Sequence, residues 1–159
     1  MPRLSLGTLL GTSPAGTVWP RPPGAVEEGR FKALCTRCGD CTAACPHGAI
    51  GALRDGTPAM DPNRVPCHLC DGLPCVASCG EEALEPVTPE LVFLGLARIL
   101  PEKCFPFQGP ECGSCRPACP SRAITLVRTR PVIDSDRCSG CGLCKDACPV
   151  FGGAVVVDL

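Results

Sequence analysis

Residues 138–149 have the sequence CSGCGLCKDACP, and this run determines what the rest of the chain must build. Its cysteines are separated by two, two and three residues, and a proline follows the fourth. This spacing is typical of thiolates that hold [4Fe–4S] clusters, with the first three on one cluster. Gly140 and Gly142 suit such a loop, because glycine reaches positive φ at no steric cost. The run therefore predicts an iron–sulfur site.

Four versions of this run use all 16 cysteines of the 159-residue chain. Motif one (35–46) and motif four (138–149) are regular. Motif two (67–80) has four residues before its third cysteine and ends in glycine, and motif three (104–120) has seven residues after its first cysteine. The predicted metal ligands are Cys35, Cys38, Cys41, Cys45, Cys67, Cys70, Cys75, Cys79, Cys104, Cys112, Cys115, Cys119, Cys138, Cys141, Cys144 and Cys148. These thiols supply four [4Fe–4S] clusters with none left over.

A disulfide scaffold and a zinc ribbon are the two alternatives to iron. A short secreted chain this rich in cysteine is often held by disulfides, and C-x2-C pairs also bind zinc. Neither accounts for four repeats of one four-cysteine spacing with proline after the fourth cysteine. His47 and His68 lie next to or inside motifs, but with four cysteines in each motif they are expected near a cluster or in solvent, not as ligands.

Charge and hydropathy exclude several classes of protein. A net charge of −1 argues against a nucleic-acid surface, and no apolar run is long enough for a membrane span. Residues 4–10 are too short and too broken by Gly7 for a secretion signal, and no twin-arginine pair precedes them. Because thiolate clusters need a reducing setting at assembly, we expect a cytoplasmic protein.

The segments between the motifs predict short elements. Residues 1–28 are rich in proline and glycine and predict an extended arm, with Trp19 as the anchor that packs on the cluster domain. Strand pairs are expected at 49–53 with 57–60, around Asp55-Gly56, and at 123–127 with 130–133. Residues 154–157 predict a closing strand.

Residues 88–100 predict a helix that starts at Thr88-Pro89-Glu90 and stops before Pro101. The segment is apolar nearly all round, so it is either a buried connector or a docking surface for another subunit. In the long loop of motif three, Phe105 and Phe107 are expected to shield a cluster from water.

The order motif, hairpin, motif occurs twice, on either side of the predicted helix. It predicts an α+β fold of two tandem bacterial 2[4Fe–4S] ferredoxin-like modules with short hairpins, small helices and an extended N-terminal arm. The expected boundaries are 1–28 for the arm, 29–87 for the first module, 88–102 for the connecting helix and 103–159 for the second module.

Crossed ligation inside each module follows from this pairing, because the fourth cysteine of such a run reaches the other cluster. We name the four predicted sites A to D. Site A is Cys35, Cys38, Cys41 and Cys79; site B is Cys45, Cys67, Cys70 and Cys75; site C is Cys104, Cys112, Cys115 and Cys148; site D is Cys119, Cys138, Cys141 and Cys144. The alternative is nested pairing, in which motif one pairs with motif four and motif two with motif three. The spacing of motif two is similar to that in the electron-transfer subunits of molybdopterin oxidoreductases, whose motifs pair in this nested way.

Taken together, the chain resembles the ferredoxin-type proteins of the NapF, NapG and MauM group from residue 21 onward. The likeness rests on Arg21-Pro-Pro-Gly-Ala25 before the Phe31-x3-Cys35 start of motif one, on the displaced first cysteine of motif three, and on the motif order. In lacking a twin-arginine signal, the chain is similar to cytoplasmic NapF. In the wide spacing of motif two, it is similar to the exported NapG and MauM branch. Gly80 departs from the proline that usually follows the fourth cysteine.

The resemblance implies an electron relay that works with a redox enzyme such as periplasmic nitrate reductase or methylamine dehydrogenase. For a NapF-like protein it implies the alternative role of helping to mature a molybdenum catalytic subunit. A third hypothesis is a structural subunit buried in a larger redox complex. No Ser/His/Asp set, phosphate loop or spare cysteine nucleophile is present, so we expect an electron carrier, not an enzyme, whose partner is a redox enzyme or an electron-donor subunit.

Overall fold

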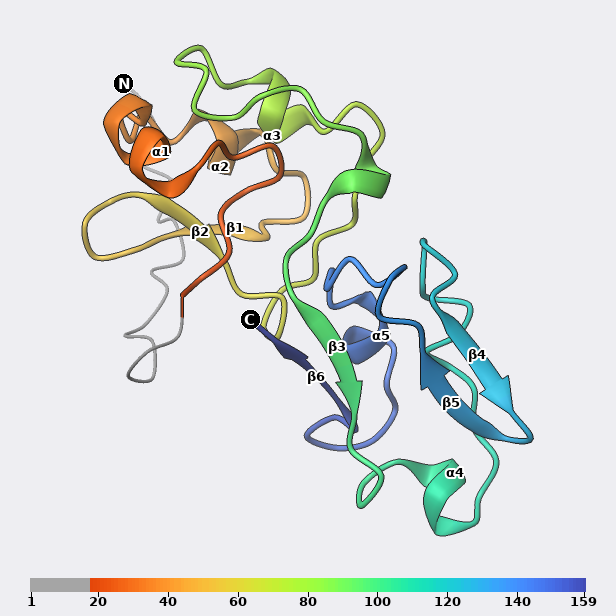
Figure 1. The fold of residues 1–159 in the computed structure, drawn as a ribbon. Helices are drawn as coiled ribbons and strands as arrows, with labels where there is room; N and C mark the ends of the chain where they lie inside the picture. The colour runs from red at the N-terminus through yellow and green to blue at the C-terminus, as the bar shows by residue number, and fades with distance from the viewer. Residues whose placement is uncertain (1–17) are drawn as a thin grey trace. The chain divides into compact units, whose positions relative to one another are not determined.

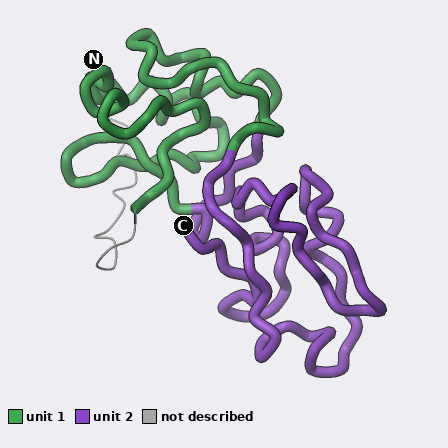
Figure 2. Tube along the Cα trace, viewed as in Figure 1, with its two compact units in different colours: residues 1–61, 70–92 green, residues 62–69, 93–159 purple. Residues whose placement is uncertain are grey.

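The computed structural model describes residues 18–159, which form two compact units (Figure 2). Among these residues, unit one holds 18–61 and Cys70–Val92, and unit two holds Pro62–Leu69 and Phe93–Leu159. These boundaries differ from the predicted ones, because 62–69 joins unit two and 88–102 is no separate connector. Within residues 18–159, no helix has the length and apolar character that crossing a bilayer requires.

Unit one consists of short helices around one hairpin (Figure 1). Its elements are α1 (Glu28–Leu34), α2 (Asp40–Ala44), β1 (Ile50–Ala52), β2 (Pro58–Met60), α3 (Pro74–Ala77) and the 3-10 turn η1 (Pro89–Leu91). The first predicted hairpin is confirmed: β1 and β2 are antiparallel, with Ile50 opposite Met60. At its turn the Asp55 carboxylate accepts hydrogen bonds from the Thr57 N–H (3.0 Å) and hydroxyl (2.6 Å).

The described part of the arm, residues 18–28, packs onto unit one and is not the coreless extension that its composition predicts. The carbonyl of Pro20 accepts a hydrogen bond from the N–H of Met60 (2.8 Å), and Ala25 forms a β-bridge with Leu84. Trp19 is half-buried, and its buried indole N–H has no hydrogen-bond partner among residues 18–159. The start of the predicted arm, residues 1–17, lies outside the described residues.

Arg21 connects the arm, α1 and the hairpin. Its guanidinium donates to both carboxylate oxygens of Glu28 (2.7 and 2.9 Å), to the Thr57 hydroxyl (2.8 Å) and to the Pro58 carbonyl (2.8 Å). It also lies 4.8 Å from the centroid of the buried Phe31 ring. The Arg21 hydrogen bond lowers the pKa of Glu28 from 4.5 to about 2. Since the folded state lowers this pKa, the stabilisation is complete above pH 4.5 and is lost as the pH falls toward 2.

Unit two carries two strand pairs (Figure 1). Its elements are β3 (Leu96–Ile99), α4 (Phe105–Gln108), β4 (Ile124–Val127), β5 (Arg130–Ile133), α5 (Leu143–Asp146) and β6 (Val155–Asp158). The second predicted hairpin and the closing strand are confirmed as β4–β5 and β6. A compact core of Ile124 and Val155 lies among cysteines of motifs three and four.

The predicted helix over 88–100 is wrong. Only η1 is helical, and 96–99 is strand β3, which pairs antiparallel with β6. Gly95 has φ 143°, which no helix contains, and a side chain there would collide with the Asp158 carbonyl. Exposure alternates along β3, from the exposed Leu96 and Arg98 to the half-buried Ala97 and Ile99. The apolar run therefore completes a sheet.

Segment 62–69 belongs to unit two because its polar groups bond there. The Asn63 side-chain amide donates to the Val157 carbonyl and its oxygen accepts from the Val157 N–H, both at 2.8 Å. The Lys145 ammonium donates to the Asn63 carbonyl (2.6 Å), and the Cys67 N–H donates to the Cys141 carbonyl (2.7 Å). Cys67, the first cysteine of motif two, is thus fixed on a ligand loop of motif four.

Replacing Arg21 with leucine is expected to lower the apparent midpoint of anaerobic thermal unfolding by about 5–10 °C, because the Glu28 carboxylate and the buried Thr57 lose their donor. Circular dichroism on the cluster-loaded protein measures the shift. Arg30→Leu is the matched control, since both partners of its ion pair with Glu85 are more than half exposed (57% and 52%). Equal shifts in the two variants would contradict the role of Arg21.

Replacing Gly140 with alanine is expected to disrupt site D, because the added Cβ would meet the backbone of Gly95 and because φ at residue 140 is 68°. The measurement is iron content after anaerobic purification, which should fall by about four atoms per chain. Gly80→Ala is the control, since nothing lies within 4 Å of a Cβ there. Full iron content in Gly140→Ala would show that the loop tolerates the side chain.

Candidate metal centres

The ligand loops of motifs one, two and four share one backbone pattern. The residue before the second cysteine has positive φ in each: Arg37 (64°), Leu69 (48°) and Gly140 (68°). The third cysteine then lies in a short helix, α2, α3 or α5, and each helix begins after another left-handed residue. Such alternation turns successive N–H groups toward one point, where negatively charged sulfur can sit. The positive φ expected at Gly140 and Gly142 is confirmed.

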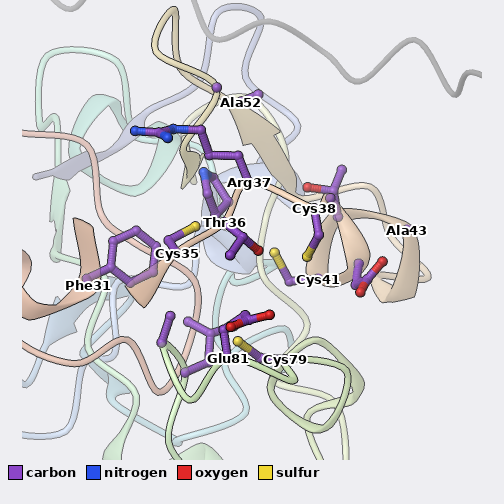
Figure 3. Close-up of a pocket in the computed structure, with 17 residues that line it drawn as sticks. Phe31, Cys35, Thr36, Arg37, Cys38, Cys41, Ala43, Ala52, Cys79 and Glu81 are labelled. Atoms are coloured by element: carbon purple, nitrogen blue, oxygen red, sulfur yellow. The ribbon is translucent and has the colours of Figure 1, made fainter. Parts of the chain in front are cut away.

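Site A lies in unit one and contains the exposed cysteine Cys38. Cys35, Cys38, Cys41 and Cys79 line a cavity of about 460 Å³, and their sulfur atoms surround one space (Figure 3). Cys41, by contrast, is buried. Burial raises the pKa of Cys41 to about 11, and the nearby thiolates of Cys35 and Cys38 add to the rise. The structure thus brings the fourth cysteine of motif two to the first three of motif one.

Three of the four predicted site B cysteines lie together in unit one. Burial raises the pKa of Cys75, and the neighbouring Cys45 and Cys70 raise it further. Cys45 is the fourth cysteine of motif one, so crossing occurs here as well. The remaining predicted member, Cys67, lies in the 62–69 segment of unit two.

Site C is smaller and more enclosed than site A. Its four predicted cysteines, Cys104, Cys112, Cys115 and Cys148, line one cavity together with Phe105. Burial raises the pKa values of Cys104 and Cys115, with Cys148 and Cys112 among the neighbours that add to it. By contrast, the backbone N–H of Ser114 lowers the pKa of Cys112.

Helix α4 covers part of site C, because it fills the long loop between the first two cysteines of motif three. Phe105 lines the cavity yet is 38% exposed, and the Arg130 guanidinium lies 5.0 Å from the centroid of the Phe107 ring. Of the two phenylalanines predicted to cover this site, Phe105 lines the cavity and Phe107 does not, and the shielding of a cluster from water stays a prediction.

Site D lies in unit two, and two of its cysteines, Cys141 and Cys144, are buried. Cys119, Cys138, Cys141 and Cys144 line a small cavity floored by Ile124 and Ile133. Burial raises the pKa of Cys144 to about 12, and the thiolates of Cys141, Cys138, Cys119 and Cys115 add to the rise. Because Cys115 belongs to site C, sites C and D are neighbours inside unit two. These contacts match sequential pairing of motif three with four and not the nested alternative.

Backbone donors to sulfur are functional groups that the motif spacing alone did not reveal. The N–H groups of Ala49, Ala97, Ala123 and Ala154 donate to the sulfur atoms of Cys45, Cys138, Cys119 and Cys148 at 3.3–3.4 Å. A sequence signal exists for the donors Ala49, Ala123 and Ala154. Shortly after the fourth cysteine of every motif, a buried alanine is followed by an aliphatic residue, at 49–50, 83–84, 123–124 and 154–155. Among residues 18–159 no such bond reaches Cys79, where glycine replaces proline.

The donor sets fit [4Fe–4S] clusters. All sixteen cysteines are free thiols, and sites A, C and D each line a common cavity. Crowded thiols with raised pKa values need cationic iron to become four thiolates, which is how metal binding and deprotonation are coupled. Within residues 18–159, no group of three or more His, Cys, Asp or Glu closes on a single ion. His47 and His68 are both exposed.

Exchange of the fourth ligand tests the crossed geometry. Cys79→Ala should remove the cluster carried by the first three cysteines of motif one, and Cys45→Ala the cluster of motif two. Each variant should lose about four iron atoms per chain. The Cys79→Ala variant should also lose the faster-chelated iron, because site A has the exposed cysteine, Cys38. If Cys45→Ala loses the fast fraction instead, each motif binds its own cluster.

Known proteins carry the same motifs over most of this chain. A family model described as "4Fe-4S dicluster domain" matches residues 103–151, and one described as "4Fe-4S binding domain" matches 30–50. The sixteen cysteines and these two domains fit four [4Fe–4S] clusters.

Curated relatives extend the match to nearly the whole chain. The ferredoxin-type protein NapG of Escherichia coli is 34% identical over 176 residues, covering 97% of this chain and 76% of NapG. The methylamine utilization ferredoxin-type protein MauM of Paracoccus denitrificans is 36% identical over 172 residues, covering 96% and 76%. The ferredoxin-type protein NapF of E. coli is 30% identical over 135 residues, covering 82% and 80%. The chain therefore belongs to the family of ferredoxin-type iron–sulfur proteins that includes NapG, MauM and NapF.

Proposed function

We propose that this protein relays electrons through four [4Fe–4S] clusters to or from a partner redox enzyme. The observation that carries the proposal is the gathering of cysteines from paired motifs around shared cavities, at sites A, C and D. Each bound cluster would accept and release one electron, which is the only redox chemistry the relay needs.

The chain's own residues supply binding, spacing and tuning. Buried cysteines such as Cys41 and Cys144 hold the sites away from water, and the N–H groups of Ala123 and Ala154 neutralise part of the charge on ligand sulfur. Such hydrogen bonds and solvent exposure set the potential of each site. Site A has the exposed Cys38 and a wide cavity, whereas Cys141 and Cys144 of site D are buried. We therefore expect clusters at sites A and D to differ in potential.

The rival roles draw less support. The proposed maturation role rests on likeness to NapF, which is 30% identical over 135 residues, against 34% over 176 residues for NapG. Ferredoxin-type proteins are electron carriers, and the motifs here are those of carriers, so we propose no catalytic role. The cytoplasmic location stays a prediction of the sequence.

The test is anaerobic purification followed by iron and sulfide analysis and by EPR during a stepwise reductive titration. The expected result is about 16 iron atoms per chain and several one-electron steps with magnetically coupled signals. About 8 to 12 iron atoms, with the rest lost from one site during handling, would favour the maturation role. Zinc in place of iron would overturn the proposal.

A further inference from the structure

The stretch 112–133 contains four arginines and no acidic residue, between Glu111 and Asp134. We call this stretch, together with Arg137, the arginine segment. Its five exposed members are Arg116, Arg122, Arg128, Arg130 and Arg137. The same stretch carries three cluster ligands of unit two: Cys112 and Cys115 of site C, and Cys119 of site D.

The fold brings members of the arginine segment together in pairs. Arg128 lies in the two-residue turn (128–129) of the β4–β5 hairpin, and Arg130 is the first residue of β5, opposite Val127. The Arg137 guanidinium donates to the Ser121 carbonyl (2.9 Å), which places it next to Arg122. Each pair therefore presents two exposed cationic side chains from neighbouring backbone positions, and such a concentration of positive charge attracts an opposite charge.

Within the described residues, no arginine of this segment forms an ion pair, although Asp134 and Asp136 lie between Arg130 and Arg137 in the sequence. The ion pairs among residues 18–159 are Arg21–Glu28, Arg30–Glu85, Lys32–Glu28 and Arg98–Asp158, and none includes the arginine segment. Unit two has nine basic and six acidic residues, whereas the described part of unit one has five basic and ten acidic residues. The net charge of the whole chain is therefore near zero because a net positive unit two offsets a net negative unit one.

Apolar side chains lie among the arginines. Val127 is 60% exposed and Val132 is 47% exposed, both on the β4–β5 hairpin. Exposed apolar side chains surrounded by arginine are typical of protein–protein interfaces, where arginine is enriched and the apolar groups supply burial. A nucleic-acid surface, by contrast, gains its affinity from phosphate contacts, and buried valine adds little to it.

Given the relay proposed above, on which this step rests, we propose that the arginine segment and the β4–β5 hairpin form the docking surface for an acidic face of the redox partner. Electron transfer falls off steeply with distance, and this surface is continuous along the chain with ligands of sites C and D. Charge complementarity would steer the partner to it and make association fast at low ionic strength. Electrons would then pass between the partner and unit two.

Two cobalt(III) oxidants of opposite charge test the surface. They are the anionic EDTA complex and the cationic hexaammine complex of cobalt(III). Each takes one electron from the anaerobically reduced protein and becomes cobalt(II). Stopped-flow absorbance gives the second-order rate constant for each at a series of salt concentrations. The variant is Arg122→Gln/Arg128→Gln. At low salt, the rate constant with the anionic oxidant should be about three- to tenfold lower in this variant than in the unmodified protein, and the two rate constants should become equal near 0.5 M salt. Rates with the cation should stay equal or rise.

The matched control is Arg30→Gln/Arg54→Gln, which removes the same charge from unit one and should leave the rate with the anion unchanged. If both double variants slow the anion equally, only net charge matters and the docking surface is refuted. If duplex DNA binds the unmodified protein at physiological salt and not Arg122→Gln/Arg128→Gln, the surface belongs to nucleic acid. A protein that neither oxidant oxidises, or that lacks iron, refutes the relay itself, which separates the two failures.

Discussion

Repulsion among crowded thiolates is the constraint on which this structure depends. Four sulfur ligands must be held a few ångströms apart, although burial and mutual charge raise their pKa values, as at Cys41 and Cys144. The chain meets this constraint with left-handed residues that curl each ligand loop, and with N–H groups that point at sulfur. Little regular secondary structure is left over, so sheets of two strands and helices of four to seven residues frame the sites.

Local chemistry predicted much of this correctly. Asp55-Gly56 marked the first hairpin, and cysteine spacing marked the sets that the structure gathers at sites A, C and D. The failures involve partners far away in sequence. A continuous apolar run reads equally well as a helix or a buried strand, and for 96–99 the strand β6 decides. Similarly, 62–69 joins unit two through Asn63 and Val157, which are 94 residues apart.

The composition of residues 18–28 misled for a different reason. Proline and glycine suggested a chain without a core, yet Arg21 gives this segment a dense set of hydrogen bonds, and Pro22 is fully buried. A single guanidinium with several fixed donors can order a stretch that buries little apolar surface of its own. The composition of residues 18–28 correctly indicates a small apolar content, but it does not predict which groups the Arg21 side chain contacts.

The pairing of β3 with β6 also sets an order of events during synthesis. Residues 96–99 leave the ribosome more than fifty residues before their partner strand at 155–158. Over that interval, β3 is an unpaired edge, and the cysteines of motif three lack Cys148. Unit one can gather the cysteines of site A as soon as Cys79 emerges, since domains fold from the N-terminus as they are made. Site C, by contrast, can be completed only after Cys148 has been made, so its four thiols come together later than those of site A.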